Sequence, residues 1–181
     1  MAIAIDELHD LIDRTLEPWS FRLETGEDYK TPPLDVRRYH HRAVRISWVP
    51  WLGRGRSVVA LIRQPPDLKA EPRDHHRLLE RVARAVTTRF PPSMGSVVGL
   101  VVIVLTAEPI APDEEDQLKE VRLDLPRSRV VPLGLIRLNL VQEAMATAHR
   151  DGPAGLFPEA GALAEAFSRR FGRFLGRLPL E

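Results

Sequence analysis

An unbroken apolar run over residues 97–105 constrains the fold more than any other feature of the chain. It reads VVGLVVIVL, and most of its residues are β-branched, which favours a strand. A membrane-spanning helix needs about 20 apolar residues, so the run is too short to cross a bilayer. We therefore expect a central strand over residues 97–106 that is covered on both faces, as in sheets flanked by helices.

The rest of the chain alternates between helical and strand-like patterns. The predicted helices cover residues 5–16, 74–90, 113–121, 141–149 and 158–178. The predicted strands cover residues 19–23, 43–51, 57–62, 97–106 and 129–140, with a loop over 25–35. The second and third of these strands form an antiparallel hairpin, and Pro132 predicts an edge position or a bulge. The pattern predicts an α/β (α+β) fold: one mixed sheet of about five strands with helices packed on it.

A length of 181 residues is typical of a single domain. The loop between residues 150 and 158 divides it into an α/β core, 1–150, and a C-terminal amphipathic helical tail, 151–181. Phe171 and Phe174 lie on the apolar face of that tail. Gly172 and Gly176 each cost a helix about 1 kcal/mol relative to Ala. The tail helix must therefore dock, either on its own domain, on a partner or on an anionic membrane surface.

The chain contains no cysteine, which excludes disulfides, thiol nucleophiles, zinc–cysteine sites and iron–sulfur clusters. The first six residues lack the basic and long apolar stretches of a secretion signal, and no segment is long enough to span a membrane. Nearly all basic residues are Arg, and Ala, Gly and Pro are abundant, as in proteins of GC-rich bacterial genomes. We expect a bacterial, cytoplasmic protein.

The charges are segregated along the chain. Residues 1–35 carry nine acidic and three basic residues, a net −6, whereas residues 36–90 carry thirteen basic and four acidic residues, a net +9. A basic block can bind phosphates or acidic partners. The alternative is that the two blocks neutralise each other in the folded chain.

Two features of the basic block are candidate binding surfaces. The predicted hairpin turn brings together Trp51, Arg54 and Arg56, and Trp and Arg are enriched in binding hot spots. The predicted helix 74–90 carries an arginine stripe opposite its apolar face. This stripe includes Arg77, Arg81 and Arg84, and it is either a phosphate-binding face or an ordinary solvated one.

The tripeptide Asp74-His75-His76 resembles the Asp-His-His signature of the DHH phosphoesterases, whose side chains bind manganese. That resemblance implies a metal-dependent hydrolase. The separate Asp-rich motifs of that family are not found upstream in this chain. Asp74 is also suited to cap a helix, and His75 falls on the apolar face of the helix it would begin. His40 and His41 begin a strand, so they should point to opposite faces of the sheet.

The order of elements resembles the core of restriction-endonuclease-like nucleases. Those enzymes hold a metal with acidic residues and a lysine on two core strands. The corresponding strand here, Ser57-Val-Val-Ala-Leu-Ile-Arg-Gln64, contains neither an acid nor a lysine. The resemblance therefore implies at most a nuclease-like fold without its catalytic residues, and topology alone does not assign a function.

No catalytic set, cofactor motif or metal-ligand spacing stands out, since phosphate loops, dinucleotide fingerprints and nucleophile elbows are all missing from the sequence. We therefore predict a non-enzymatic accessory or protein-interaction domain that uses no cofactor and binds a protein partner or a second copy of itself. The alternatives are a nucleic-acid-binding domain that uses residues 36–90 and a metal-dependent hydrolase.

Overall fold

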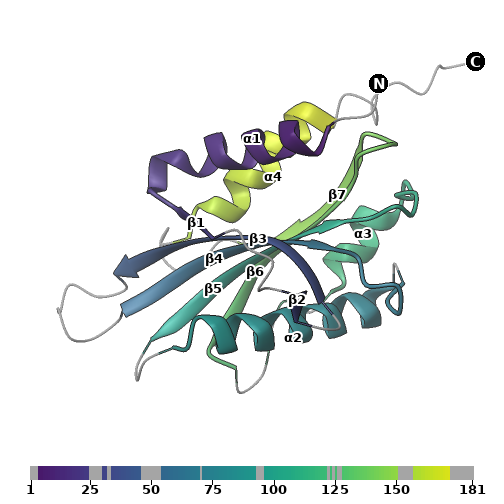
Figure 1. Cartoon of the computed structure of the whole chain (residues 1–181). Coiled ribbons are helices and arrows are strands. Elements are labelled where there is room, and N and C mark those ends of the chain that lie inside the picture. The colour runs from purple at the N-terminus through teal and green to yellow at the C-terminus, as the bar shows by residue number, and fades with distance from the viewer. Residues whose placement is uncertain are drawn as a thin grey trace, which may run out of the picture.

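Seven strands form one mixed sheet in the computed structural model (Figure 1). The structure describes residues 4–24, 30–31, 34–45, 54–69, 71–92, 96–121, 123, 125, 128–150 and 157–171. The strands are β1 (Arg22–Glu24), β2 (Lys30–Thr31), β3 (Leu34–Arg45), β4 (Arg54–Arg63), β5 (Val97–Leu105), β6 (Val130–Asn139) and β7 (Ala144–His149). The helices are α1 (Ile5–Leu16), the short 3-10 helix η1 (Glu17–Trp19), α2 (Pro72–Arg89), α3 (Glu114–Lys119) and α4 (Glu159–Phe171).

The strand order across the sheet is β1-β3-β4-β5-β6-β7, and β2 pairs with one end of β3. β4, β5 and β6 run parallel to one another, whereas the outer pairs on both sides are antiparallel. The predicted mixed α/β class and the antiparallel β3–β4 pair are thereby confirmed. The expected number of strands was too low, because β2 and β7 were not predicted.

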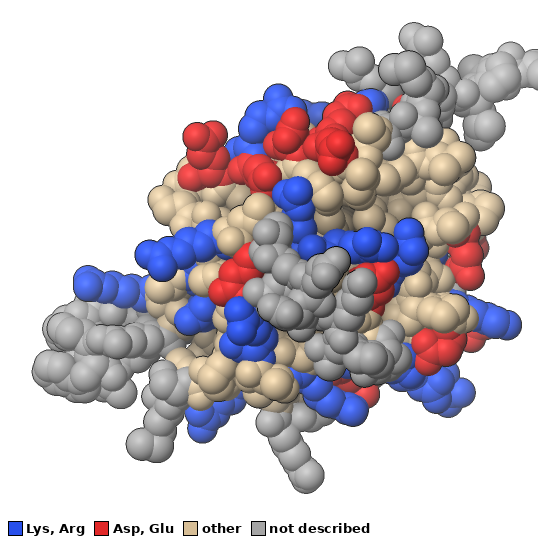
Figure 2. Space-filling view, viewed as in Figure 1, with Lys and Arg blue, Asp and Glu red and all other residues tan. Residues whose placement is uncertain are grey.

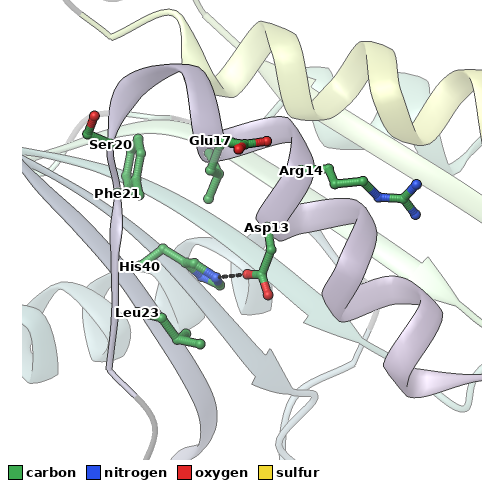
Figure 3. Close-up of a pocket in the computed structure, with 8 residues that line it drawn as sticks. Asp13, Arg14, Glu17, Ser20, Phe21, Leu23 and His40 are labelled. Carbon is green, nitrogen blue, oxygen red and sulfur yellow. Dashed lines mark hydrogen bonds and ion pairs between the residues drawn. The ribbon is translucent and has the colours of Figure 1, made fainter.

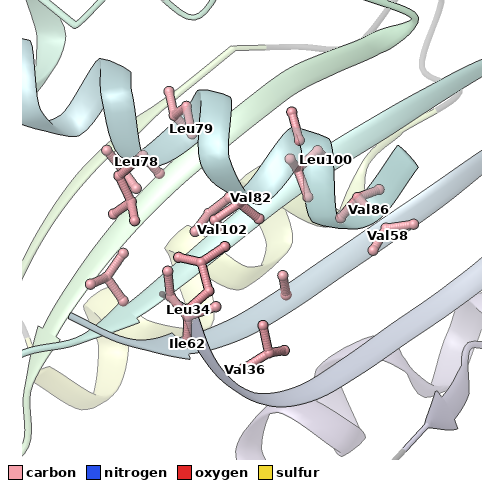
Figure 4. Packing of buried hydrophobic residues seen from close by; sticks show 14 of the residues in the cluster. Leu34, Val36, Val58, Ile62, Leu78, Leu79, Val82, Val86, Leu100 and Val102 are labelled. Carbon is pink, nitrogen blue, oxygen red and sulfur yellow. The ribbon is translucent and has the colours of Figure 1, made fainter. Parts of the chain in front are cut away.

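Helices cover both faces of the sheet. α2 and α3 make the crossovers between the parallel strands and lie on one face, and α1 and α4 lie side by side on the other (Figure 1). Each face has its own apolar core. One core joins the sheet to α2, where Val82 and Val86 pack against Val58 and Leu100 (Figure 4). The other joins the sheet to α1 and α4. None of the described helices combines the length and apolar character needed to cross a membrane.

The segment 141–149 was predicted as a helix, and this prediction was wrong, because residues 144–149 form β7. Ala and Met favour helices, but here the pairing with β6 overrides that preference. Asn139 marks the turn between the two strands, since its Oδ1 accepts hydrogen bonds from the backbone N–H groups of Val141 and Gln142 at 3.0 and 2.8 Å.

The strand predicted over 43–51 in fact begins at Leu34, and residues 46–51 lie outside the described part of the chain. A bulge between Val36 and Arg38 explains the error. Leu34, Val36 and Tyr39 all face the same core, and their spacing of two and then three residues breaks the strand period.

The predictions made for Pro132 and for Asp74 had different outcomes. Pro132 lies in an internal strand, and the expected bulge is confirmed. Pro132 pairs with Leu100 and Gly134 with Val101, so Leu133 has no register partner in β5. The expectation that Asp74 caps α2 was wrong, because α2 already begins at Pro72. Asp74 lies in the first turn, where an acidic side chain interacts favourably with the helix dipole.

The tight contact between β5 and the α4 side of the sheet gives a test of this packing. A methyl group on Gly99 would lie 2.7 Å from Leu133 Cδ1 and 2.7 Å from the Phe157 ring. Both neighbours are buried, so we expect Gly99→Ala to lower the free energy of unfolding by about 1–3 kcal/mol. The measurement is urea denaturation followed by circular dichroism.

Gly161→Ala is the matched control, because a methyl group there meets no atom within 4 Å. It lies inside α4, where Ala is favoured over Gly by up to about 1 kcal/mol, so this variant should be at least as stable as the wild type. Equal stability of the two variants would contradict the packing around Gly99.

Candidate functional site

A basic pocket lies at the edge of the sheet, where β1 begins. Among the described strands, β1 pairs with residues 39–41 of β3 alone, and the chain before it turns away through η1. Ser20, between η1 and β1, has a left-handed backbone with φ of 54°. This turn leaves a cavity of about 330 Å³, which we call the arginine pocket. It is lined by Trp19, Ser20, Arg22, His41, Arg42, Ala43 and Arg56.

Arg56 is held in this pocket by groups that carry no negative charge. Its Nη1 lies 3.1 Å from His41 Nδ1, and its guanidinium carbon lies 5.0 Å from the centre of the Phe90 ring. Such a cation–π contact orients a guanidinium without neutralising it. Among the described residues, no carboxylate forms an ion pair with Arg56.

His41 connects Arg56 to the edge strand. Its Nε2 lies 3.0 Å from Glu24 Oε1. Burial lowers the pKa of His41 below its usual 6.5, Glu24 opposes this effect, and Arg56 reinforces it. At neutral pH the ring is therefore uncharged, with its proton on Nε2 donated to Glu24 and the Nδ1 lone pair accepting from Arg56.

Arg22 and Arg42 complete the basic lining of the pocket. Arg42 extends toward α4, where its Nη2 lies 3.1 Å from Glu159 Oε2 and its guanidinium lies over the Phe21 ring. No described carboxylate forms an ion pair with Arg22. The pocket thus has two guanidinium groups, those of Arg22 and Arg56, whose charge is not balanced by a described carboxylate. This arrangement suits an anion such as a carboxylate or phosphate.

Among the predicted binding residues whose side chains the structure describes, one contributes to this pocket. Trp51 and Phe174 lie outside the described residues, and Arg54 begins β4. Phe171 is 1% exposed and packs against Phe167, so its ring is part of the α1–α4 core. Arg56 is the one that lines the pocket.

The three arginines of α2 that were predicted as binding residues each form an ion pair with a carboxylate. Arg77 lies 3.3 Å from Asp74, Arg81 lies 2.7 Å from Asp67, and Arg84 lies 3.9 Å from Glu80. The prediction of pocket residues missed Trp19, Arg22 and Arg42. Their separation from Arg56 in the sequence gave no local signal, since the β1–β3–β4 pairing alone brings them together.

A second pocket, the α1 pocket, lies between α1 and the sheet edge (Figure 3). It has a volume of about 450 Å³ and shares Ser20 with the arginine pocket. Its lining residues are Asp13, Arg14, Leu16, Glu17, Ser20, Phe21, Leu23 and His40. His40 Nε2 lies 2.6 Å from Asp13 Oδ1, and burial lowers the pKa of His40.

The Asp13–His40 pair does not have the connections of a catalytic dyad. Arg38 lies 3.4 Å from the second oxygen of Asp13, so both carboxylate oxygens are engaged. The other ring nitrogen of His40, Nδ1, is buried and makes no hydrogen bond to a described group. No described hydroxyl is therefore activated by this histidine, and the pair instead ties α1 to β3.

The residues of the Asp-His-His tripeptide point to different partners. Asp74 accepts a hydrogen bond from the Lys69 backbone, His75 is 3% exposed in the core as its spacing predicts, and His76 lies 3.6 Å from Glu80. Within the described residues, no three His, Asp or Glu side chains are grouped so that they could hold a metal ion. His40 and His41 lie on opposite faces of β3, as expected, so they do not form a joint site.

A buried polar cluster fills the carboxyl ends of the parallel strands. Arg137 is fully buried and pairs with Glu114, which is also buried. Its Nη2 lies 2.9 Å from Gln64 Oε1 and 3.2 Å from Thr106 Oγ1. The carboxyl ends of parallel strands are where open α/β sheets usually bind ligands. Here Arg137 and its partners occupy that place themselves, so the cluster is structural.

Comparison of the chain with protein-family models, with curated proteins and with solved structures gives no match. The fold and its edge pocket therefore define the class: a mixed α/β domain with an arginine-lined pocket at one edge of its sheet. β4, the strand compared above with a metal-binding strand of nucleases, carries no acidic residue and no lysine.

The Arg137–Glu114 pair predicts a strong dependence of stability on both partners. Arg137→Met leaves Glu114 as a buried charge without its cation, which should cost about 3–5 kcal/mol. Replacing both residues, in Arg137→Met/Glu114→Leu, should recover at least half of that loss, because a buried ion pair is often replaceable by apolar groups. Urea denaturation of the two variants measures this, and a double variant no more stable than the single one would contradict it.

His75 predicts a pH dependence of stability. Burial, followed by the charge of Arg137, lowers its pKa from 6.5 to about 4. Between these values the unfolded chain binds more protons than the folded one, so the free energy of unfolding falls as the pH drops from 6.5 toward 4. The full loss is up to about 3 kcal/mol at 1.36 kcal/mol per pKa unit.

His75→Gln should flatten this slope, whereas His149→Gln, at an exposed position, should not. Denaturation curves at pH 7, 6, 5 and 4.5 make the comparison. An unchanged slope in His75→Gln would show that His75 is not the group responsible.

Proposed function

We propose that this chain is a non-enzymatic protein-interaction domain of a bacterial cytoplasmic system, and that it binds acidic side chains of a protein partner in the arginine pocket. The observation that carries the proposal is the setting of Arg56. A guanidinium fixed by a neutral histidine and an aromatic ring keeps its full charge and its orientation. Such a preorganised cation binds an anion without a large cost in side-chain entropy.

The composition of the pocket supports a protein ligand. Trp19 stands beside three arginines in the lining, and Trp and Arg are the residues most enriched at binding hot spots. Arg22 and Arg56 can each bind a carboxylate through two N–H groups. The described residues contain no nucleophile–base set and no metal-ligand group that would favour an enzyme.

Nucleic acid is the alternative raised by the basic segment 36–90. Binding a phosphate backbone requires a row of cations without acidic neighbours. Four of the five arginines of α2, all except Arg73, have carboxylate partners. Arg37 and Arg38 pair with Asp35 and Asp13. Basic and acidic groups are likewise interspersed on the face seen in Figure 2. The local neutralisation of these charges favours a compact anionic ligand over a long polyanion.

Binding of fluorescein-labelled hexaglutamate, followed by fluorescence anisotropy at low salt, tests this function. Arg56→Gln and Arg22→Gln should each weaken binding by about tenfold, since a hydrogen bond to a charged group contributes about 1.5–3 kcal/mol. Arg84→Gln is the matched control, because it removes the same charge from the exposed face of α2 and should change the dissociation constant less than twofold.

Two results would overturn the proposal. One is a loss of binding in Arg84→Gln equal to that in Arg56→Gln, which would indicate a response to net charge alone. The other is tighter binding of single-stranded DNA of equal charge than of hexaglutamate, which would favour the nucleic-acid alternative.

A further inference from the structure

His41 links the arginine pocket to a chain of contacts that crosses three elements. Its Nδ1 lies 3.1 Å from Arg56 Nη1 on β4, and its Nε2 lies 3.0 Å from Glu24 Oε1 on β1. The other oxygen of Glu24 accepts hydrogen bonds from Arg89 of α2 at 3.1 and 3.0 Å. The centre of the Phe90 ring lies 5.0 Å from the centre of the His41 ring and 5.0 Å from the guanidinium carbon of Arg56. The imidazole is thus held from β1, β4 and the end of α2, and it also lines the pocket.

The free pocket disfavours a proton on Nδ1 of His41. Burial lowers the pKa of His41 most, Glu24 opposes this effect, and the charges of Arg56 and Arg22 lower the pKa further. The uncharged ring therefore directs its Nδ1 lone pair toward Arg56 Nη1 and accepts a hydrogen bond from it. A lone pair does not attract an anion, so in this state His41 positions Arg56 but contributes nothing to the binding of a carboxylate.

A carboxylate bound to Arg56 changes this balance. An ionised acceptor lies about 2.7–2.9 Å from the nitrogen that donates to it, and Nη1 of Arg56 lies 3.1 Å from Nδ1 of His41. A carboxylate oxygen bound to Nη1 is therefore at most about 6 Å from Nδ1. A negative charge within about 4–6 Å raises the pKa of an imidazole, and the same charge offsets those of Arg56 and Arg22.

Protonation gives the imidazole a second donor without breaking its contact with β1. Nε2–H continues to donate to Glu24, and Nδ1–H is directed to the side of the ring where Arg56 lies. Arg56 loses one acceptor, but the Phe90 ring and the bound carboxylate still hold its guanidinium. The pocket then has a third cation beside Arg22 and Arg56.

The neighbours of His41 allow a pH effect to be assigned to it. The described charged groups around the ring are Glu24 and Arg22 from β1, Arg56 from β4 and, bound to Glu24, Arg89 from α2. None of these is a histidine, and histidine is the side chain whose ordinary pKa lies between pH 5 and 8. A change in binding across this range that disappears when His41 is replaced can therefore be ascribed to its imidazole.

We infer that His41 is a further anion-binding residue of the arginine pocket: it takes up a proton from solvent when an acidic side chain of the partner binds Arg56, and its Nδ1–H then donates to that carboxylate. The inference rests on the proposed function, because it uses the arginine pocket as the acid-binding site. A proton taken up on binding makes the affinity rise as the pH falls, by the reciprocity of linked equilibria. The domain therefore binds its partner more tightly in mildly acidic than in mildly alkaline solution.

The pH dependence of hexaglutamate binding tests this inference. The probe is rhodamine-labelled hexaglutamate, followed by anisotropy at pH 8 and pH 6 and at constant ionic strength, because its carboxylates stay ionised over this range. The wild type should bind at least about threefold more tightly at pH 6. His41→Asn keeps a hydrogen-bond acceptor but cannot take up a proton, so it should lose this change. His149→Asn, at an exposed position on the opposite edge of the sheet, should keep it.

An NMR titration of the His41 ring in the wild type gives a second readout that needs no variant. The midpoint should lie at least about one pH unit higher with saturating hexaglutamate than without it. An unchanged midpoint, equal affinity at the two pH values, or a pH dependence that persists in full in His41→Asn would overturn the inference. If binding still depends on Arg56 in that case, the proposed function survives. If hexaglutamate binds at neither pH, both proposals fail together.

Discussion

The burial of β4, β5 and β6 on both faces is the constraint on which the rest of this structure depends. Parallel strands need crossovers that return over the sheet, and α2 and α3 supply them on one face. The second face is equally apolar, and it can be buried only if α1 and α4, from the two ends of the described chain, come together there. The core thus decides which elements are left at the edges of the sheet.

Buried polar side chains in this core pair with one another in clusters, and one such cluster shapes the candidate site. Glu159 is fully buried in the first turn of α4, where it pairs with Arg42 and accepts a hydrogen bond from Ser57. A carboxylate at a helix N-terminus is favourable for the helix dipole. This cluster fixes α4 to β3 and β4 and, at the same time, holds Arg42 at the wall of the arginine pocket. The docking of α4 and the geometry of the pocket are therefore set by the same side chains.

Patterns confined to one element were predictable from the sequence, and pairings between elements were not. The apolar run of β5 and the amphipathic pattern of α2 each carry their own signal. β7 does not, because its Ala-rich sequence favours a helix until β6 is beside it, and the bulge in β3 hides the start of that strand. The arginine pocket depends on pairings between elements. Arg56 was predicted as a binding residue, but its neighbours Trp19, Arg22 and Arg42 join it only through strand pairing.

The contrast between the two edges bears on how the domain can assemble. A sheet that is open at both edges can recruit strands on both sides and grow into a chain of molecules. In this sheet α3 and α4 both contact β7, and four of its six residues are buried, whereas Ala43 and Arg45 of β3 are exposed. The burial of β7 thus removes one route to self-association, because a strand added there would need open N–H and C=O groups.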